Sequence, residues 1–257
     1  MVLTNPWTGE ESPGLIDWAT MPTYNTIMSL AAGAGLLGLL MLYRELRSAS
    51  GARRLDDEGD VPGIAAEGWA LTFGVLGVIL ATTGLHMSLT WPLAAGGFAF
   101  DNVIFGEPSL AFGVLLLGAA IFLWKRADEL RASVHPLRVV ARHAAPASIF
   151  VVGLGLACFA IAVAGVVYQL FAAPPQEPIS GAFAEWPILE AIFISGLYAL
   201  VGLGAVLFPA GVTEARTGAL GVASKVAGVA WGLAGLAFLL FGAMNYYTHI
   251  GLIVNTM

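Results

Sequence analysis

The chain has 257 residues, of which 58% are hydrophobic and only 11% are charged, and its mean hydropathy is +0.82. Soluble globular domains carry about 25% charged residues, so this composition excludes that class and indicates an integral membrane protein whose first partner is the lipid bilayer. The formal net charge is −6, and no basic patch is present, so nothing indicates nucleic-acid binding. Cys158 is the one cysteine, which rules out an intrachain disulfide and a thiolate metal cage.

The N-terminal segment, 1–22, contains no lysine or arginine and no short apolar core. It therefore does not resemble a cleavable signal peptide. It is acidic and aromatic, and its prolines interrupt any long helix. We expect it to lie at the outer water interface, with Trp7 and Trp18 at the depth of the lipid headgroups.

Six stretches reach the roughly 20 apolar residues that cross the hydrocarbon of a bilayer. They cover residues 24–43, 67–89, 108–125, 146–171, 187–208 and 225–248. The predicted fold is therefore all-α, a polytopic bundle of six transmembrane helices. One transmembrane domain, 1–257, accounts for the whole chain.

The basic residues fall in alternate connections between these stretches. The first, third and fifth connections and their flanks hold all eleven of them: Arg44, Arg47, Arg53, Arg54, Lys125, Arg126, Arg131, Arg138, Arg142, Arg216 and Lys225. The positive-inside rule places these connections in the cytoplasm and both termini outside it. We therefore predict a multi-pass protein of the cell membrane with extracytoplasmic N and C termini.

A weak two-span repeat is visible. The second and third stretches enclose an outer loop that ends in Glu107-Pro108, and the fourth and fifth enclose one that ends in Trp186-Pro187. Proline is favoured in the first turn of a helix, where its missing N–H costs nothing. Each half would thus cross the membrane outward and return as a helical hairpin. Two unrelated pairs of helices, each joined by an outer loop, would account for the match equally well.

The polar residues near the membrane gather at the outer end of the predicted bundle. They are His86, Asp101, Glu107, Glu190, Asn245 and His249. An ionisable group in hydrocarbon costs several kcal/mol, so such groups usually face the bundle interior and have partners. Asn245 and His249 are four residues apart and share a helix face, and Thr82, His86 and Thr90 form a polar stripe on the second span.

Two imidazoles with carboxylates suit a divalent metal such as zinc, copper or iron. The candidate ligands are His86, Asp101, Glu107, Glu190 and His249. No HxxxH or ExxH spacing supports the set. The competing structural interpretation is that both histidines are interfacial side chains with wet rings, and that Glu107 offsets the positive end of the helix that it opens.

Four functional hypotheses stay open. The first is the polar, metal-binding outer site, in a protein that acts alone or as a subunit of a membrane redox complex. The second is a b-type haem held by His86 and His249. The third is a structural or accessory subunit whose outer loops dock other membrane subunits or a second copy of the chain. The fourth is a conductor of small solutes or ions. Neither an enzymatic reaction nor a substrate is indicated.

The stretch from His86 to Pro108 carries a resemblance to a known family. The run His86-Met87-Ser88-Leu89-Thr90-Trp91-Pro92-Leu93, a short loop and then Phe105-Gly106-Glu107-Pro108 resembles the prokaryotic multi-pass membrane proteins of domain of unknown function 981. The motif covers about thirty residues, and the likeness in hydrophobic pattern covers most of the chain. The resemblance implies the architecture and draws attention to these residues, and it supplies no activity.

Overall fold

The computed structural model describes residues 16, 18, 20–55, 63–93 and 98–257, and within these ranges it is helical without strands. The helices are α1 (Asn25–Leu55), α2 (Ala66–Leu89), α3 (Glu107–Lys125), α4 (Ala127–Ala132), α5 (Pro136–Ala144), α6 (Ser148–Val167), α7 (Pro187–Thr217) and α8 (Val222–Thr256). Three short turns of helix complete them: a π-helical turn, η1 (Asn102–Gly106), and two 3-10 turns, η2 (Ala145–Ala147) and η3 (Ser180–Phe183).

Six helical segments are long and apolar enough to cross a membrane, which confirms the predicted number. They are Asn25–Gly51, Ala66–Leu89, Asn102–Lys125, Pro136–Val167, Pro187–Thr217 and Val222–Thr256. Most are longer than the predicted stretches, because hydropathy measures the apolar run whereas the helix continues into polar sequence. Large apolar side chains such as Leu71, Ile149 and Val163 are exposed on their outward faces, as lipid contact requires.

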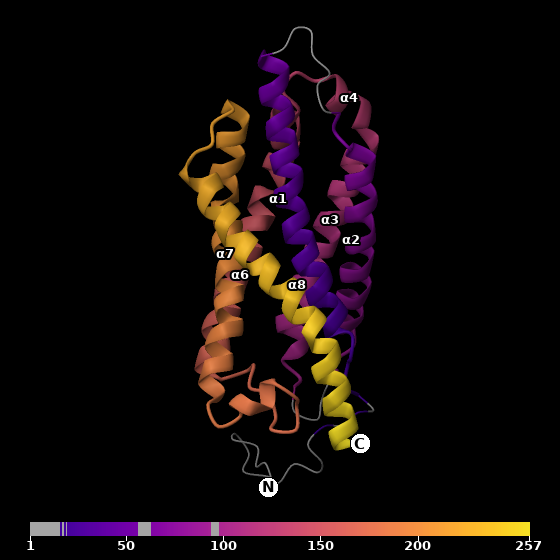
Figure 1. Ribbon diagram of the computed structural model, residues 1–257, viewed down its shortest axis with the longest axis vertical. Coiled ribbons are helices and arrows are strands. Elements are labelled where there is room, and N and C mark those ends of the chain that lie inside the picture. Colours follow the sequence, from indigo (N-terminus) through magenta and orange to yellow (C-terminus); the bar gives the residue numbers. More distant parts are fainter. Residues whose placement is uncertain (1–15, 17, 19, 56–62, 94–97) are drawn as a thin grey trace.

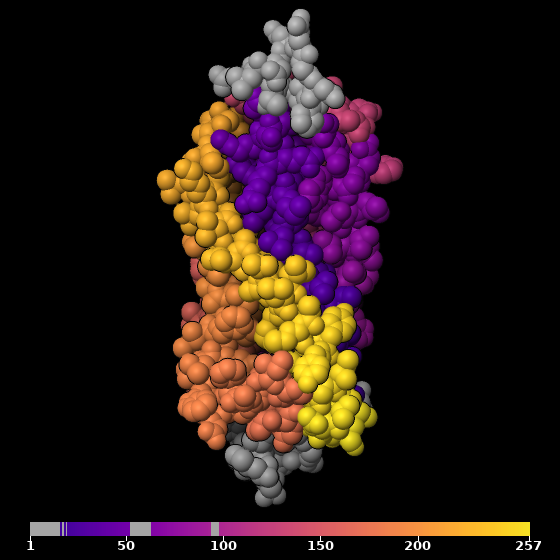
Figure 2. Space-filling model, in the orientation of Figure 1, coloured from indigo at the N-terminus to yellow at the C-terminus, as the bar shows by residue number. Residues whose placement is uncertain are grey.

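The six helices pack as three antiparallel pairs, α2 with α3, α6 with α7, and α1 with α8. Figure 1 shows the α2–α3 and α6–α7 hairpins on opposite sides, with α1 and α8 crossing between them. In Figure 2 the side chains of α1 and α8 run across the middle of one face of the elongated body. Each hairpin has a proline in the first turn of its second helix, as the repeat predicts, with Pro108 in α3 and Pro187 in α7.

Glycines bring the backbones together in all three pairs. A Cβ atom at Gly33 of α1 would lie 2.6 Å from the carbonyl oxygen of Gly235 in α8, and one at Gly84 of α2 would lie 2.4 Å from the backbone nitrogen of Leu110 in α3. Gly155 of α6 meets α7 in the same way. Close backbone approach is a main source of helix association in lipid, so these contacts define the bundle.

The two ends of the bundle differ in charge. Lys and Arg side chains in the described ranges lie where α1, α3 and α7 end and α8 begins, and on α4 and α5; this is the basic end. The opposite end, where α8 stops at Thr256, is called the C-terminal end below (Figure 1). Arg131 of α4 forms a 2.5 Å ion pair with Glu67 of α2 and ties the basic end together.

The predicted interfacial segment, 1–22, lies mostly outside the described residues. Of its two tryptophans, Trp18 is described, and its indole N–H donates a 3.2 Å hydrogen bond to the hydroxyl of Thr256. The segment that precedes α1 is therefore fastened to the end of α8.

Candidate functional site

The stretch from His86 to Pro108 builds a helical hairpin. Asn102 holds its loop: its side-chain oxygen accepts the backbone N–H of Leu93 at 3.2 Å, and its amide donates to the carbonyl oxygens of Met87 and, at 2.8 Å, of Thr90. Gly106 lies against Met87 with no room for a Cβ. Sequence reasoning missed Asn102, because an asparagine in a loop gives no signal before its carbonyl partners are placed.

Two of the five candidate ligands lie away from the interior of the bundle. His86 is exposed, and its Nδ1 is 2.6 Å from the hydroxyl of Tyr24. Glu107 is also exposed, and it occupies the first turn of α3, where a negative charge offsets the positive end of the helix dipole. Both side chains therefore have the surroundings that the structural interpretation predicts.

The polar stripe on α2 does not face the interior either. Thr82 is exposed, and its hydroxyl donates to the carbonyl oxygen of Val78 at 2.8 Å. Thr83 bonds back to Ile79 at 2.6 Å. A hydroxyl that is satisfied within its own helix can face lipid, so these threonines need no polar partner in the bundle interior.

The other three candidates line one large cavity. The cavity has a volume of about 650 Å³ and is lined by α1, α3, α5, α6, α7 and α8 together with the loop between α6 and α7. Asp101, Glu190 and His249 all contribute to its wall. Asn245 also lines it, so Asn245 and His249, four residues apart on α8, both face the cavity.

At the C-terminal end of this cavity a carboxyl group meets an imidazole. Glu177, in the loop between α6 and α7, places Oε1 3.9 Å from Nε2 of His249. Burial raises the pKa of Glu177, although a hydrogen bond from the Thr248 hydroxyl opposes the shift. Glu190 lies nearby and accepts the backbone N–H of Ala173 at 2.7 Å. Sequence reasoning missed Glu177, because only the fold of its proline-rich loop turns it inward.

Asp101 lies deeper, directly before η1. Its side chain is buried, with 4% of its surface exposed, and burial raises its pKa to about 7. None of the ion pairs among the described residues includes it. The neighbouring η1 is held by Tyr198 of α7, whose hydroxyl donates to the carbonyl oxygen of Ile104 at 2.5 Å.

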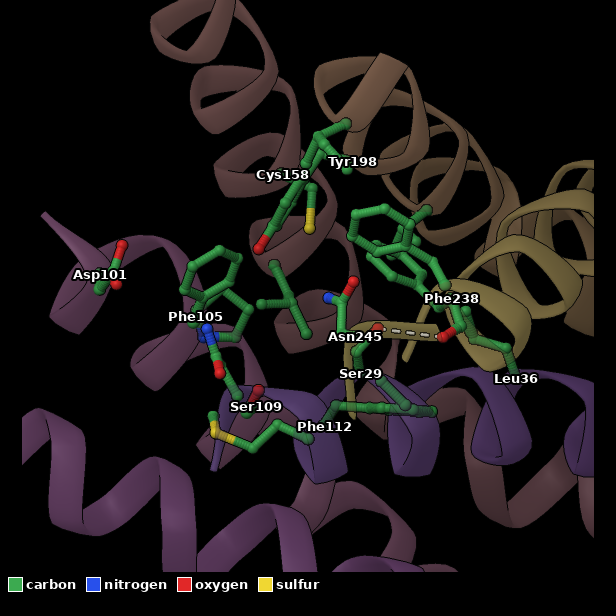
Figure 3. A pocket seen from close by; sticks show the side chains of 18 of the residues that line it. Ser29, Leu36, Asp101, Phe105, Ser109, Phe112, Cys158, Tyr198, Phe238 and Asn245 are labelled. Carbon is green, nitrogen blue, oxygen red and sulfur yellow. Dashed lines mark hydrogen bonds between the residues drawn. The ribbon is translucent and has the colours of Figure 1, made fainter. Parts of the chain in front are cut away.

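Aromatic side chains surround the middle of the cavity (Figure 3). Phe171 stacks on Tyr198 with ring centres 5.9 Å apart, and Phe238 meets Tyr198 edge-on at 6.1 Å. Phe105 completes the group at 6.3 Å from Phe171. Polar residues are few here, so the cavity combines an apolar body with a polar C-terminal end.

The predicted metal and haem sites need their ligands to converge. Within the ranges that the structure describes, no three His, Cys, Asp or Glu side chains are grouped so that they could hold a metal ion. His249 lines the cavity, whereas His86 does not and pairs with Tyr24 instead. The two imidazoles thus have no common space for a haem, and the residues present do not fit either group.

Fold and cavity together define a polytopic α-helical bundle with an internal chamber. The chain belongs to the family described as protein of unknown function DUF981, whose model matches residues 21–251. This confirms the resemblance and extends it from the motif to the six long helices and the cavity. Neither the curated proteins nor the solved structures contain a match to the chain.

Proposed function

We infer that the protein binds an elongated lipophilic molecule from the bilayer, with the chain of the molecule in the apolar body of the cavity and its polar head at the C-terminal end. The observation that supports this proposal most strongly is the cavity itself. Ligand pockets usually have volumes of about 300–1,000 Å³, with mostly apolar walls and a few polar groups that fix orientation. A volume of about 650 Å³ with Glu177, Asn245 and His249 at one end fits that description.

The shape of the cavity favours a long molecule. Along α1 the lining reaches from Asn25 to Leu42, which is about 25 Å of helix. This length approaches the roughly 30 Å thickness of the hydrocarbon layer. On the opposite wall the lining runs from His249 near the end of α8 to His143 in α5 at the basic end.

The bilayer has a route to the cavity between α3 and α6, which touch only sparsely. Val114 of α3 lines the cavity, and 53% of its surface is also exposed. Gly118, one turn further, combines the same two properties. A lipophilic molecule could therefore enter sideways without crossing water.

The positive-inside rule sets the orientation within this proposal. With the basic end in the cytoplasm, the polar end of the cavity is its outer mouth, which is where the sequence places the polar site. A molecule from the outer leaflet would bind with its head at the depth at which it already lies.

Other functions have weaker support. An ion pathway usually contains a ring of carbonyl oxygens or charged side chains that replaces the hydration shell of the ion, whereas aromatic and aliphatic residues form the middle of this cavity. The hypothesis of a structural subunit that only docks a partner gives the cavity no role. The metal-binding alternative lacks a convergent set of ligands in the described ranges.

A quenching experiment tests the proposal. The indole of Trp231 lies in the cavity wall and donates to the carbonyl oxygen of Val201 at 3.1 Å. Terminally brominated dodecanol added to the protein in lipid nanodiscs should quench this tryptophan saturably, and Trp231→Phe should remove that component of the signal.

Two alanines allow a matched comparison. Ala119 lines the cavity, whereas Ala157 is exposed on α6 outside it. Ala119→Phe should abolish the saturable quenching, and Ala157→Phe, which adds the same volume, should preserve it. Equal quenching in both variants would mean that the probe reaches Trp231 from the bulk lipid and would refute the proposal.

A further inference from the structure

Two amide oxygens at the C-terminal end of the cavity lack hydrogen-bond partners. They are Oδ1 of Asn25 and Oδ1 of Asn245, both buried and both in the cavity wall. Only 8% of the surface of Asn245 is exposed, and its amide projects into the cavity (Figure 3). A buried acceptor that is left unpaired destabilises the folded state, so a ligand that donates hydrogen bonds here would remove this penalty.

Carboxyl groups make the same end rich in acceptors. Asp101, Glu177 and Glu190 all line the cavity. Glu190 uses Oε2 for the N–H of Ala173, which leaves Oε1 free to accept. The lysines and arginines of the described ranges all lie at the opposite, basic end. A bound head group would therefore meet carboxyl and amide oxygens, with the imidazole of His249 nearby and with no lysine or arginine of the described ranges at this end.

Aromatic rings line the middle of the cavity, beyond these acceptors. Phe171, Tyr198 and Phe238 form one continuous group of stacked and edge-on contacts. The face of an aromatic ring attracts a cation, and it does so more strongly where water is excluded. Carboxylates beside aromatic faces are the usual surroundings of a bound ammonium group.

We propose that the C-terminal end of the cavity is a subsite for the ammonium head of a lipophilic amine, with Glu177, Glu190 and Asn245 as its principal contacts. This inference rests on the proposed function, since the hydrocarbon part of the amine would occupy the apolar body. An anionic head would be repelled by the carboxylates. A hydroxyl could satisfy Asn245 but would gain no charge attraction.

The proposal predicts a dependence on pH. The titratable groups that face Glu177 are His249 from α8 and Glu190 from α7, and those near Asp101 are Tyr198 from α7 and Cys158 from α6. Burial raises the pKa of Glu177 and raises that of Asp101 to about 7, so Asp101 is partly protonated near neutral pH. A fixed cation favours their ionised forms. Binding should therefore release protons and become tighter from pH 6 to pH 8.

Three probes with the same chain separate the possibilities: dodecylammonium, dodecanol and dodecylsulfonate, each brominated at the chain terminus. Their affinities are measured by Trp231 quenching in zwitterionic nanodiscs at pH 6 and pH 8, with Ala119→Phe as the background for partitioning into lipid. Glu177→Gln and Glu190→Gln are tested separately, because glutamine keeps the size of the side chain and one acceptor oxygen. Thermal unfolding confirms that each variant is folded.

We expect the ammonium probe to bind about tenfold more tightly than dodecanol at pH 8, as one charge-assisted contact would give. Each glutamine variant should reduce that preference while dodecanol binding stays unchanged. Equal affinities for the three probes, or a preference for the sulfonate, would overturn the head-group assignment and leave the chamber intact. If no probe distinguishes the wild type from Ala119→Phe, the proposed function itself fails.

Discussion

His249 Nε2 and Glu177 Oε1 lie 3.9 Å apart at the C-terminal end of the cavity. One residue belongs to α8 and the other to the loop between α6 and α7, so the last helix lies against the loop of the α6–α7 hairpin at this point. Its separation exceeds that of a direct hydrogen bond. The two groups are therefore neighbours that leave their polar atoms accessible to a ligand.

Asp101 should make the stability of the fold depend on pH. Burial raises its pKa from 3.8 to about 7, so the folded state holds its proton more tightly than the unfolded state does. Stability should therefore fall as the pH rises from about 4 to about 7, by up to about 4 kcal/mol. Asp101→Asn should flatten this dependence in thermal unfolding measured between pH 4.5 and pH 8. An unchanged slope in that variant would contradict the assignment.

Asn102 should be the main support of the loop between α2 and α3. Asn102→Ala removes three hydrogen bonds and leaves buried carbonyl groups unpaired, and we expect a loss of about 2–4 kcal/mol in the free energy of unfolding. Asn255 is the matched control, because it is exposed and makes one bond of 2.8 Å to the carbonyl oxygen of Gln176. Asn255→Ala should cost less than about 1 kcal/mol, and comparable losses in denaturant titrations would argue against the role of Asn102.

The glycine contacts should be specific to position. At Gly84 a Cβ would lie 2.4 Å from the backbone nitrogen of Leu110, whereas at Gly153 nothing lies within 4 Å. Gly84→Ala should destabilise the protein by about 1–3 kcal/mol. Gly153→Ala should be neutral or stabilising by about 0.5–1 kcal/mol, because alanine favours the helix. Thermal unfolding of both variants in the same lipid checks the contrast, and equal effects would mean that α2 and α3 can separate easily.

The six helices could be predicted from the sequence because each apolar run approaches the thickness of a bilayer. Asp101, Glu190 and His249 could likewise be predicted as interior groups, because exposure to lipid would penalise them. The prediction that His86 and Glu107 belong with them rests only on their similar depth in the membrane. Depth does not fix rotation about a helix axis, and the structure places His86 against Tyr24 on the outside.

Glu177 and Asn102 depend on loop conformation, which periodicity does not encode. The cavity is harder still to foresee, since it results from the sparse contact of α3 with α6. The hydropathy of two apolar helices is the same whether they pack against each other or lie apart. Only the packed bundle separates the three polar groups that share a chamber from the two that do not.

The orientation of the bundle is open to a labelling test. Ala182 lies in η3 at the C-terminal end and Ala132 at the end of α4, and both are exposed. In a Cys158→Ala background, Ala182→Cys should react with a membrane-impermeant maleimide in intact cells, whereas Ala132→Cys should react only after permeabilisation. The reverse pattern would place the basic end outside and the polar end of the cavity in the cytoplasm.

The central claim is that the cavity holds a lipophilic molecule. Native mass spectrometry of the protein released from its own membrane measures this most directly, because a molecule held between helices of the bundle should survive the loss of detergent. We predict a bound species of lipid-like mass on the wild type and on Ala157→Phe, and its absence from Ala119→Phe. A wild-type protein that carries no added mass, or an identical adduct on all three proteins, would contradict the claim.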